Sequence, residues 1–255
     1  MSERSSRALE YGNTAISKIK NLLSTQVEVL EKSANVIFES LNARDPMSTS
    51  VWHIFGAGHS HMAAEEAFHR AGGLIPISAW LEDYLMPHGG PSRNGPLERL
   101  SGIAQVIFNF YNPLPGEVLT IFSNSGINST SVELAEIAKS HGVSTVAITN
   151  LDHSKQTPTR HSGGKKLYEV CDYVIDTGGV RGDAAMIIPG LDAPVGPLST
   201  IINCIVVNYL TVRICELYSE NMLVAPVYMS ANVPGGDERN RKLEQQFRPR
   251  IPRLL

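Results

Sequence analysis

The chain has 255 residues, 42% of them hydrophobic, and its 22 basic and 25 acidic residues leave a net charge of −3. This length and composition allow a buried core in one large or two modest domains. A charge so close to balance excludes a general attraction to nucleic acid or to an anionic membrane. Because the N-terminus lacks the apolar run of a secretion signal and no segment approaches the roughly 20 apolar residues of a membrane helix, we expect a cytoplasmic protein.

The three cysteines are expected to be reduced. Cys171, Cys204 and Cys215 form no CxxC pair and show no regular spacing, and the last two lie in an apolar helical pattern. The sequence therefore predicts core thiols without a disulfide or a metal.

Apolar residues near the N-terminus follow a helical period. From Ile16 to Leu41 they recur at steps of three and four, with charged residues between them. This pattern predicts an amphipathic helix, or two in line, that ends before residues 43–50. Its apolar stripe either covers a core face or pairs two subunits, and both can hold. We assign residues 1–49 to an N-terminal helical arm.

From residue 51 onwards, short β-branched runs alternate with helical stretches. Strands are predicted at residues 51–55, 74–78, 117–122, 143–149 and 173–176, and helices at about 60–71, 128–141 and 199–220. This rhythm calls for parallel strands joined by crossover helices, so the predicted fold is a doubly wound α/β sandwich over residues 50–220. The tail, 221–255, would complete the site or a dimer. The long polar loops are expected to carry function, at 79–96, 150–166 and 177–197.

Two strand-to-helix turns are suited to an anion. In "FGAGHS", Gly56 and Gly58 permit a tight turn and a close approach to a ligand, and Ser60 can cap the next helix or offer its hydroxyl. The turn "SNSGINS" gathers hydroxyls and amides around a glycine, namely Ser123, Asn124, Ser125, Gly126, Asn128 and Ser129. Free N–H groups and the helix dipole favour a phosphate there, although the same residue types also form ordinary capping turns.

Neither a nucleotide cofactor nor a metal is expected. The dinucleotide fingerprint GxGxxG would need a third glycine where His61 stands, and no acidic residue lies within 74–78. His61, Glu65 and His69 recur every four residues on a predicted helix, but they lack the HExxH order and no second cluster completes a ligand set. The sequence also offers no support for a Ser–His–Asp or Cys–His arrangement.

Together, "GAGHS" after the first strand and "SNSG" after a later one resemble the sugar isomerase (SIS) domain family, over about residues 35–218. The segments "FGAGHS", "RAGG", "SNSGIN" and "SANVPGGDERN" are most similar to a little-characterised group of stand-alone SIS proteins, related to sugar-phosphate isomerases, an aminosugar-phosphate deaminase type and N-acetylmuramic acid 6-phosphate etherases. The resemblance implies a flavodoxin-like, five-stranded parallel sheet and a phosphosugar bound at a homodimer interface without a cofactor. By the same resemblance, Ser123, Asn124 and Ser125 would hold the phosphate, and His59 and Ser60 would face the sugar.

Two positions depart from the family pattern. Asn128 stands where a Ser or Thr is usual, but its amide can still donate hydrogen bonds. Arg70 occupies the place of a glutamate that several isomerases and etherases carry. Glu66, one helical turn nearer the glycine turn, is therefore our candidate for the base, and His59 could open the sugar ring or bind a hydroxyl. The alternative is that Glu66 simply pairs with Arg70 on the surface and that His59 is an ordinary polar loop residue.

Other polar residues are weaker candidates for the site. Ser199 and Thr200 begin the last predicted helix and either cap it or touch the ligand. Reserve carboxylates and possible tail contacts, the latter in a loop expected at residues 230–240, are Glu82, Asp83, Asp183, Asn232 and Asn240.

The leading functional hypothesis is an enzyme that isomerises, deaminates or eliminates from an amino- or acetamido-hexose phosphate and assembles as a homodimer or higher homo-oligomer. The alternative is a non-catalytic phosphosugar-sensing module, which the arginine at position 70 favours. Direct DNA binding is not expected, because the first 50 residues lack a helix-turn-helix pattern and an excess of basic residues. A purely structural subunit is a third hypothesis, which predicts no response to any phosphosugar.

Overall fold

The computed structural model describes residues 6–42 and 49–254. Its main sheet has five parallel strands in the order β2-β1-β3-β4-β5. The strands are β1 (Trp52–Gly56), β2 (Ile77–Trp80), β3 (Val118–Phe122), β4 (Ser144–Thr149) and β5 (Tyr173–Asp176). This is the doubly wound, flavodoxin-like order, so the predicted fold class is confirmed.

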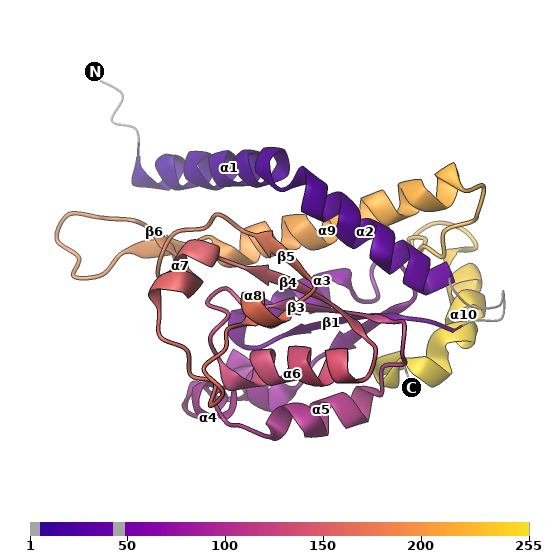
Figure 1. Cartoon of the computed structure of the whole chain (residues 1–255). Coiled ribbons are helices and arrows are strands. Elements are labelled where there is room, and N and C mark those ends of the chain that lie inside the picture. The colour runs from indigo at the N-terminus through magenta and orange to yellow at the C-terminus, as the bar shows by residue number, and fades with distance from the viewer. Residues whose placement is uncertain (1–5, 43–48, 255) are drawn as a thin grey trace, which may run out of the picture.

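Helices cover both faces of the sheet (Figure 1). One face carries α1 (Arg7–Thr25), α2 (Val27–Asn42), α3 (Met62–Ala67) and α9 (Ser199–Glu220), and the other carries α5 (Ile103–Tyr111), α6 (Ser129–Ser140) and α8 (Leu167–Val170). Successive strand side chains alternate between these layers: Ile54 packs under α9, whereas Phe55 packs toward α5. Both faces are therefore buried, as a parallel sheet requires, and ligands can reach only the sheet's edges.

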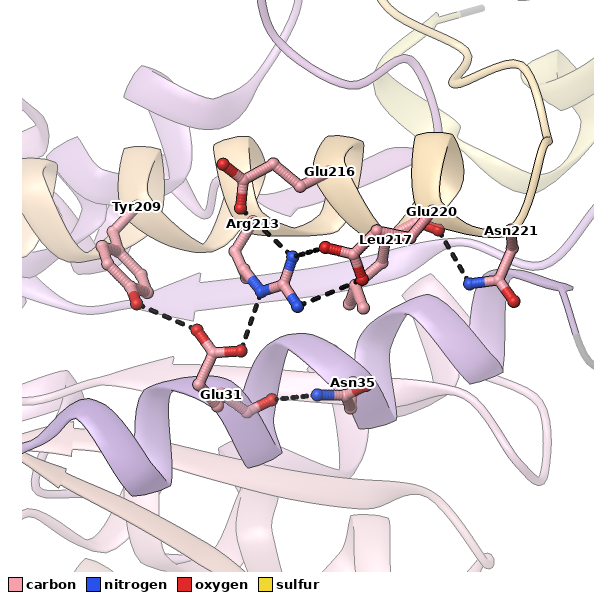
Figure 2. A network of polar contacts seen from close by, with 8 residues as sticks. All are labelled: Glu31, Asn35, Tyr209, Arg213, Glu216, Leu217, Glu220 and Asn221. Atoms are coloured by element: carbon pink, nitrogen blue, oxygen red, sulfur yellow. Dashed lines mark hydrogen bonds and ion pairs between the residues drawn. The ribbon is translucent and has the colours of Figure 1, made fainter.

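The N-terminal stripe forms two helices in line, with a break at Gln26. Leu30, Ala34 and Ile37 of α2 are wholly buried in the same core as the sheet, so the interpretation as a core-covering helix is confirmed. On the surface between α2 and α9, Arg213 donates to Glu31 at 2.7 Å (Figure 2). This pair is half-buried, and the fully buried apolar side chains of α2 fix the helix on the core. The boundary drawn at residues 49 and 50 remains a prediction.

The segment after the glycine turn differs from the expected helix over about 60–71. A 3₁₀ turn, Gly58–His61, leads into α3, which ends at Ala67. The chain then leaves the helix because the main chain of Gly72 and Gly73 hydrogen-bonds with Tyr228 of the tail. The long helix predicted from residue 60 is therefore wrong, since a tertiary contact overrides its local pattern.

The long loops contain short elements of their own. They include α4 (Pro91–Leu97), α7 (Leu151–Gln156), the antiparallel pair β6 (Ala184–Met186) and β7 (Val195–Pro197), and 3₁₀ turns at Asp83–Leu85 and Pro87–Gly89. The tail forms α10 (Gly236–Phe247) and the 3₁₀ turns Arg248–Arg250 and Pro252–Leu254. The expectation of a loop at residues 230–240 is thus wrong from Gly236 onwards.

The helix α9 is long and apolar enough to cross a membrane by length and composition, with a mean hydropathy of 1.4. The sequence-based statement that no segment approaches this limit is therefore wrong. However, Ile202, Val206 and Leu210 of α9 are fully buried against the other helices of its layer. The helix serves as a core element of this fold.

The three cysteines are free and only half-buried, which corrects their placement in the core. Burial raises the pKa of each thiol, to about 12 for Cys171. Thiols in such surroundings stay protonated and unreactive at neutral pH.

A buried polar network fastens the tail to the amino ends of the central strands. The His53 ring is fully buried; its Nδ1 accepts from the Trp80 indole, and its Nε2 lies 3.0 Å from Glu117. Glu117, itself 1% exposed, accepts two further hydrogen bonds from Arg250 at 3.0 and 2.9 Å. Burial opposes ionisation, but the His53 and Arg250 contacts still lower the pKa of Glu117 to about 2. The helix α10 packs at this amino edge through Phe247, which clusters with Val51 and Ile75, whereas Arg253 of the last turn reaches the Leu81 carbonyl just beyond the carboxyl end of β2.

Candidate functional site

The two anion-suited turns lie side by side at the carboxyl edge of the sheet. Strands β1 and β3 are neighbours, and Gly56 pairs in register with Phe122. The turns that follow these two residues therefore leave the sheet together. In the observed strand order this is also where the winding direction reverses, which is the usual ligand position in open α/β sheets. The structure thus brings together the two motifs that the sequence singled out.

The glycine turn is shaped by close packing of its own backbone. A Cβ at Gly56 would collide with the main-chain carbonyl of Ser60, so no larger residue fits there. The buried His61 ring contacts the Gly58 carbonyl and turns inward. His59 is exposed, and neither its ring nor the Ser60 hydroxyl makes a hydrogen bond to a residue within 6–42 or 49–254. These two side chains are free to meet a ligand.

The SNSG turn combines a fixed backbone with unused donors. Gly126 has a φ of +61°, and a Cβ there would lie 2.9 Å from the Thr149 hydroxyl oxygen. The buried Ser123 Oγ accepts from the Gly126 N–H at 3.2 Å, which leaves its own hydroxyl proton available. Across the described part of the chain, the Asn124 amide and the Ser125 hydroxyl have no hydrogen-bond partner. A backbone held in this way with open donors is an arrangement suited to an anion.

Asn128 lies between two charged side chains that the sequence analysis missed. It is the N-cap residue of α6, and its Oδ1 accepts from Nη1 of Arg160 at 2.7 Å. The half-buried carboxylate of Glu98 lies close enough to the Asn128 side chain to interact with it. Burial raises the pKa of Glu98. Both residues lie about 30 positions from Asn128 in sequence, so only the folded chain brings them to it.

Glu66 is held by the pairing that we weighed as the alternative. It forms an ion pair with Arg70, and its Oε1 also accepts from Asn208 on α9 at 2.8 Å. Its side chain is 27% exposed. The carboxylate is thus engaged toward α9, and its role as a base remains a prediction.

Asp183 accepts the free N–H groups at the start of α9. Asp183 accepts from the main-chain N–H of Ser199 at 2.8 Å and from its hydroxyl at 2.7 Å. The cap of α9 is therefore the carboxylate of Asp183 and not the Ser199 hydroxyl, which itself donates to Asp183. A ligand contact by Ser199 stays a prediction.

The remaining candidates lie apart from the turns or in structural contacts. Glu82 accepts from the Tyr111 hydroxyl at 2.9 Å, and the neighbouring Asp83 is exposed. Asn240 is buried in α10 and bonds both ways to the main chain of Met229. Because α10 covers the amino edge, Asn232 and Asn240 could reach only a partner chain's site.

One loop does approach the glycine turn. The His88 ring lies 5.9 Å from that of His61, centroid to centroid, and the Asn94 amide faces Gly58 at the distance of ordinary contact. These two residues sit within the predicted functional loop 79–96, but nothing in their local sequence marked them.

The residues considered for a metal do not converge. His61 Nε2 lies 3.4 Å from Glu65, whereas His69 pairs with Glu244 of the tail at 3.2 Å. Across residues 6–42 and 49–254 there is no group of three or more such side chains with the spacing of a metal site.

This fold and site define an open α/β protein with a ligand cradle at the winding reversal. A family model described as the SIS domain matches residues 10–150. The chain therefore belongs to the SIS domain family, and within it to the UPF0309 proteins. It is 40% identical to a UPF0309 protein of Caldanaerobacter subterraneus over 239 residues, which cover 93% of this chain and 96% of that one. A UPF0309 protein of Geobacillus kaustophilus is 38% identical over 92% of this chain and 91% of its own length.

Solved structures share the fold at low sequence identity. A phosphoheptose isomerase from Francisella tularensis superposes with a TM-score of 0.51 at 15% identity, covering 81% of this chain and 95% of that one. The phosphoheptose isomerase of Neisseria gonorrhoeae gives the same score and identity over 84% and 97%. At this identity the likeness concerns the fold alone.

Proposed function

We propose that the chain binds a phosphorylated sugar with its phosphate in the SNSG turn and its sugar against the glycine turn. The observation that carries the proposal is the adjacency of two turns whose Ser60, Asn124 and Ser125 side chains are unused within the described residues. Ser123, Gly126 and Asn128 complete the phosphate cradle, and Gly58 and His59 face the sugar. Membership of the SIS family and the phosphoheptose isomerase neighbours support this choice of ligand.

For the reaction, we propose isomerisation, deamination or elimination on an amino- or acetamido-hexose phosphate, without a cofactor. Each begins with ring opening and removal of the C2 proton, which needs a base near C2 and a donor near the C1 oxygen. Glu66 is proposed as the base and His59 as the group that assists ring opening. For Glu66 to act, its carboxylate must leave the contact with Arg70 when the sugar binds.

The second candidate is a sensor that binds the same ligand without turning it over. The pairing of Glu66 with both Arg70 and Asn208 favours it, because these contacts would have to break before the carboxylate could take a proton from a sugar.

We also propose that the chain acts as a homodimer or higher homo-oligomer. In support, Ile201, Ile205 and Val212 leave an exposed apolar strip on one side of α9. Light scattering of the purified chain tests this: a monomer at micromolar concentration contradicts the proposal.

A thermal-shift screen of hexose and aminohexose 6-phosphates tests the function. A ligand at 100 times its Kd should stabilise the fold by about 2.7 kcal/mol, which is readily seen as a rise in Tm. NMR of each stabilising compound then separates an enzyme, which forms product, from a sensor, which does not. For an enzyme, Glu66→Gln should abolish turnover but keep the rise in Tm, whereas unchanged turnover removes Glu66 from the mechanism. If no phosphosugar shifts Tm, the proposed function is wrong.

A further inference from the structure

The SNSG turn contains no basic side chain of its own. Its donors are hydroxyls, an amide and main-chain N–H groups. A phosphate dianion held only by neutral donors binds less strongly than one that also meets a guanidinium, because charge-assisted hydrogen bonds are about twice as strong as neutral ones. The question is therefore which cation of the folded chain reaches this turn.

Arg160 is fixed against the turn by its own main chain. Its N–H donates to the Ile127 carbonyl at 2.9 Å, and its carbonyl accepts from the Ser129 hydroxyl at 3.0 Å. These two contacts flank Asn128 on either side and hold the backbone of Arg160 independently of its guanidinium. Arg160 is exposed, and its guanidinium donates one N–H to Asn128. Within the described residues its other donors have no partner, so four N–H groups remain for a ligand.

Two lysines near this edge are engaged elsewhere. Lys166 donates to the Ser154 and Lys155 carbonyls of α7 at 2.6 and 3.2 Å. Lys165 pairs with Glu136 at 2.8 Å. Among residues 6–42 and 49–254, Arg160 is the cation whose side chain hydrogen-bonds within residues 123–129.

The carboxylate of Glu98 lies beside the same residue, Asn128, and its charge is opposite to that of Arg160. Its main-chain carbonyl accepts from the Thr130 N–H at 3.2 Å, which fixes it beside the first turn of α6, and its carboxylate reaches the Asn128 side chain. An anion in the cradle would meet attraction from Arg160 and repulsion from Glu98 at short range, where Coulomb energies are largest.

We propose that Arg160 is a ligand-binding residue of the phosphate cradle and that Glu98 limits the cradle's affinity for anions. The inference rests on the proposed function, since it assigns residues to the same cradle. It deepens that function by defining the ligand group as an anion that accepts two parallel N–H bonds from a guanidinium, as a phosphate ester does.

The test is calorimetric titration of the full chain with inorganic phosphate at constant ionic strength. Arg160→Gln should raise the Kd for phosphate about tenfold, because it removes charge-assisted bonds. Glu98→Gln keeps the shape of the side chain and should lower the Kd about threefold, since it removes the repulsion. A gain in affinity cannot result from partial unfolding.

The matched controls are Arg248→Gln and Glu238→Gln. Both remove the same charges from exposed positions on the tail, at the opposite edge of the sheet, and should leave the Kd unchanged. If Ser125→Ala weakens phosphate binding but neither Arg160→Gln nor Glu98→Gln differs from its control, the assignment of Arg160 and Glu98 fails while the cradle stands. If the wild-type chain binds neither phosphate nor any hexose 6-phosphate, the proposed function itself is overturned.

Discussion

Polar side chains gather at both edges of the sheet, but they are hydrogen-bonded at the amino edge and unpaired at the carboxyl edge among the described residues. At the amino edge, the buried His53 and the half-buried Arg250 are both bonded to the buried Glu117. At the carboxyl edge, Ser60 and Ser125 lie on turns with the backbone fixed and the side chains unpaired among the described residues. Polarity alone therefore does not mark a functional site. A polar group whose hydrogen-bond partners all come from the protein stabilises the fold. A polar group on a fixed backbone that lacks such partners is available to a ligand.

The largest effect is expected at the amino edge. Glu117→Ala leaves the buried His53 ring and the half-buried Arg250 guanidinium without their acceptor. Removing one partner of a buried charged pair costs about 3 to 5 kcal/mol. Urea unfolding should show this loss, together with detachment of the tail. Glu238→Ala on the exposed side of α10 is the matched control and should change stability by less than about 0.5 kcal/mol. A similar small loss for Glu117→Ala would mean that the network is not structural.

The same network predicts how stability depends on pH. Burial lowers the pKa of His53 in the fold below 6.5, so the unfolded chain binds the proton first and stability falls as pH drops below about 6.5. The pKa of Glu117 is also depressed, from 4.5 to about 2, so its contribution is present above pH 4.5 and is lost progressively toward pH 2.

Unfolding free energies measured from pH 7 to 3 test this assignment. Glu117→Gln should be less stable than the wild type at pH 7 but lose less stability between pH 4.5 and 3. Parallel pH profiles for the two proteins would show that Glu117 does not carry the dependence.

Local patterns were enough to predict the central fold. Strands β1, β3, β4 and β5 are apolar runs bounded by turn residues, and α6 and α9 end within about two residues of their predicted limits. The helix α10 was missed because its polar sequence gains its order from Phe247 and Asn240, which pack and bond against the amino edge. Likewise α3 is shorter than its sequence pattern predicts, because the segment after α3 hydrogen-bonds with the main chain of Tyr228 in the tail.

The site was predictable only where its residues are contiguous. The two turns are local motifs, so their residues could be named from sequence alone. Arg160 and Glu98 lie 32 and 30 positions from Asn128 in the sequence and approach it only in the folded chain. No local sequence motif therefore marks them as neighbours of Asn128. For Glu66, the sequence allowed two interpretations, a catalytic base and an ion pair with Arg70. The folded chain adds a hydrogen bond from Asn208 to that ion pair.

The central claim is that the carboxyl-edge turn is built for an anion and not for stability. Ser125→Ala tests it most directly, with urea unfolding and phosphate titration on the same preparation. Because the Ser125 hydroxyl has no partner among the described residues, the variant should keep its free energy of unfolding within about 0.5 kcal/mol. Its Kd for phosphate should rise about tenfold, since a hydrogen bond to a charged group is lost. A variant that loses stability but binds phosphate as the wild type does would contradict the account.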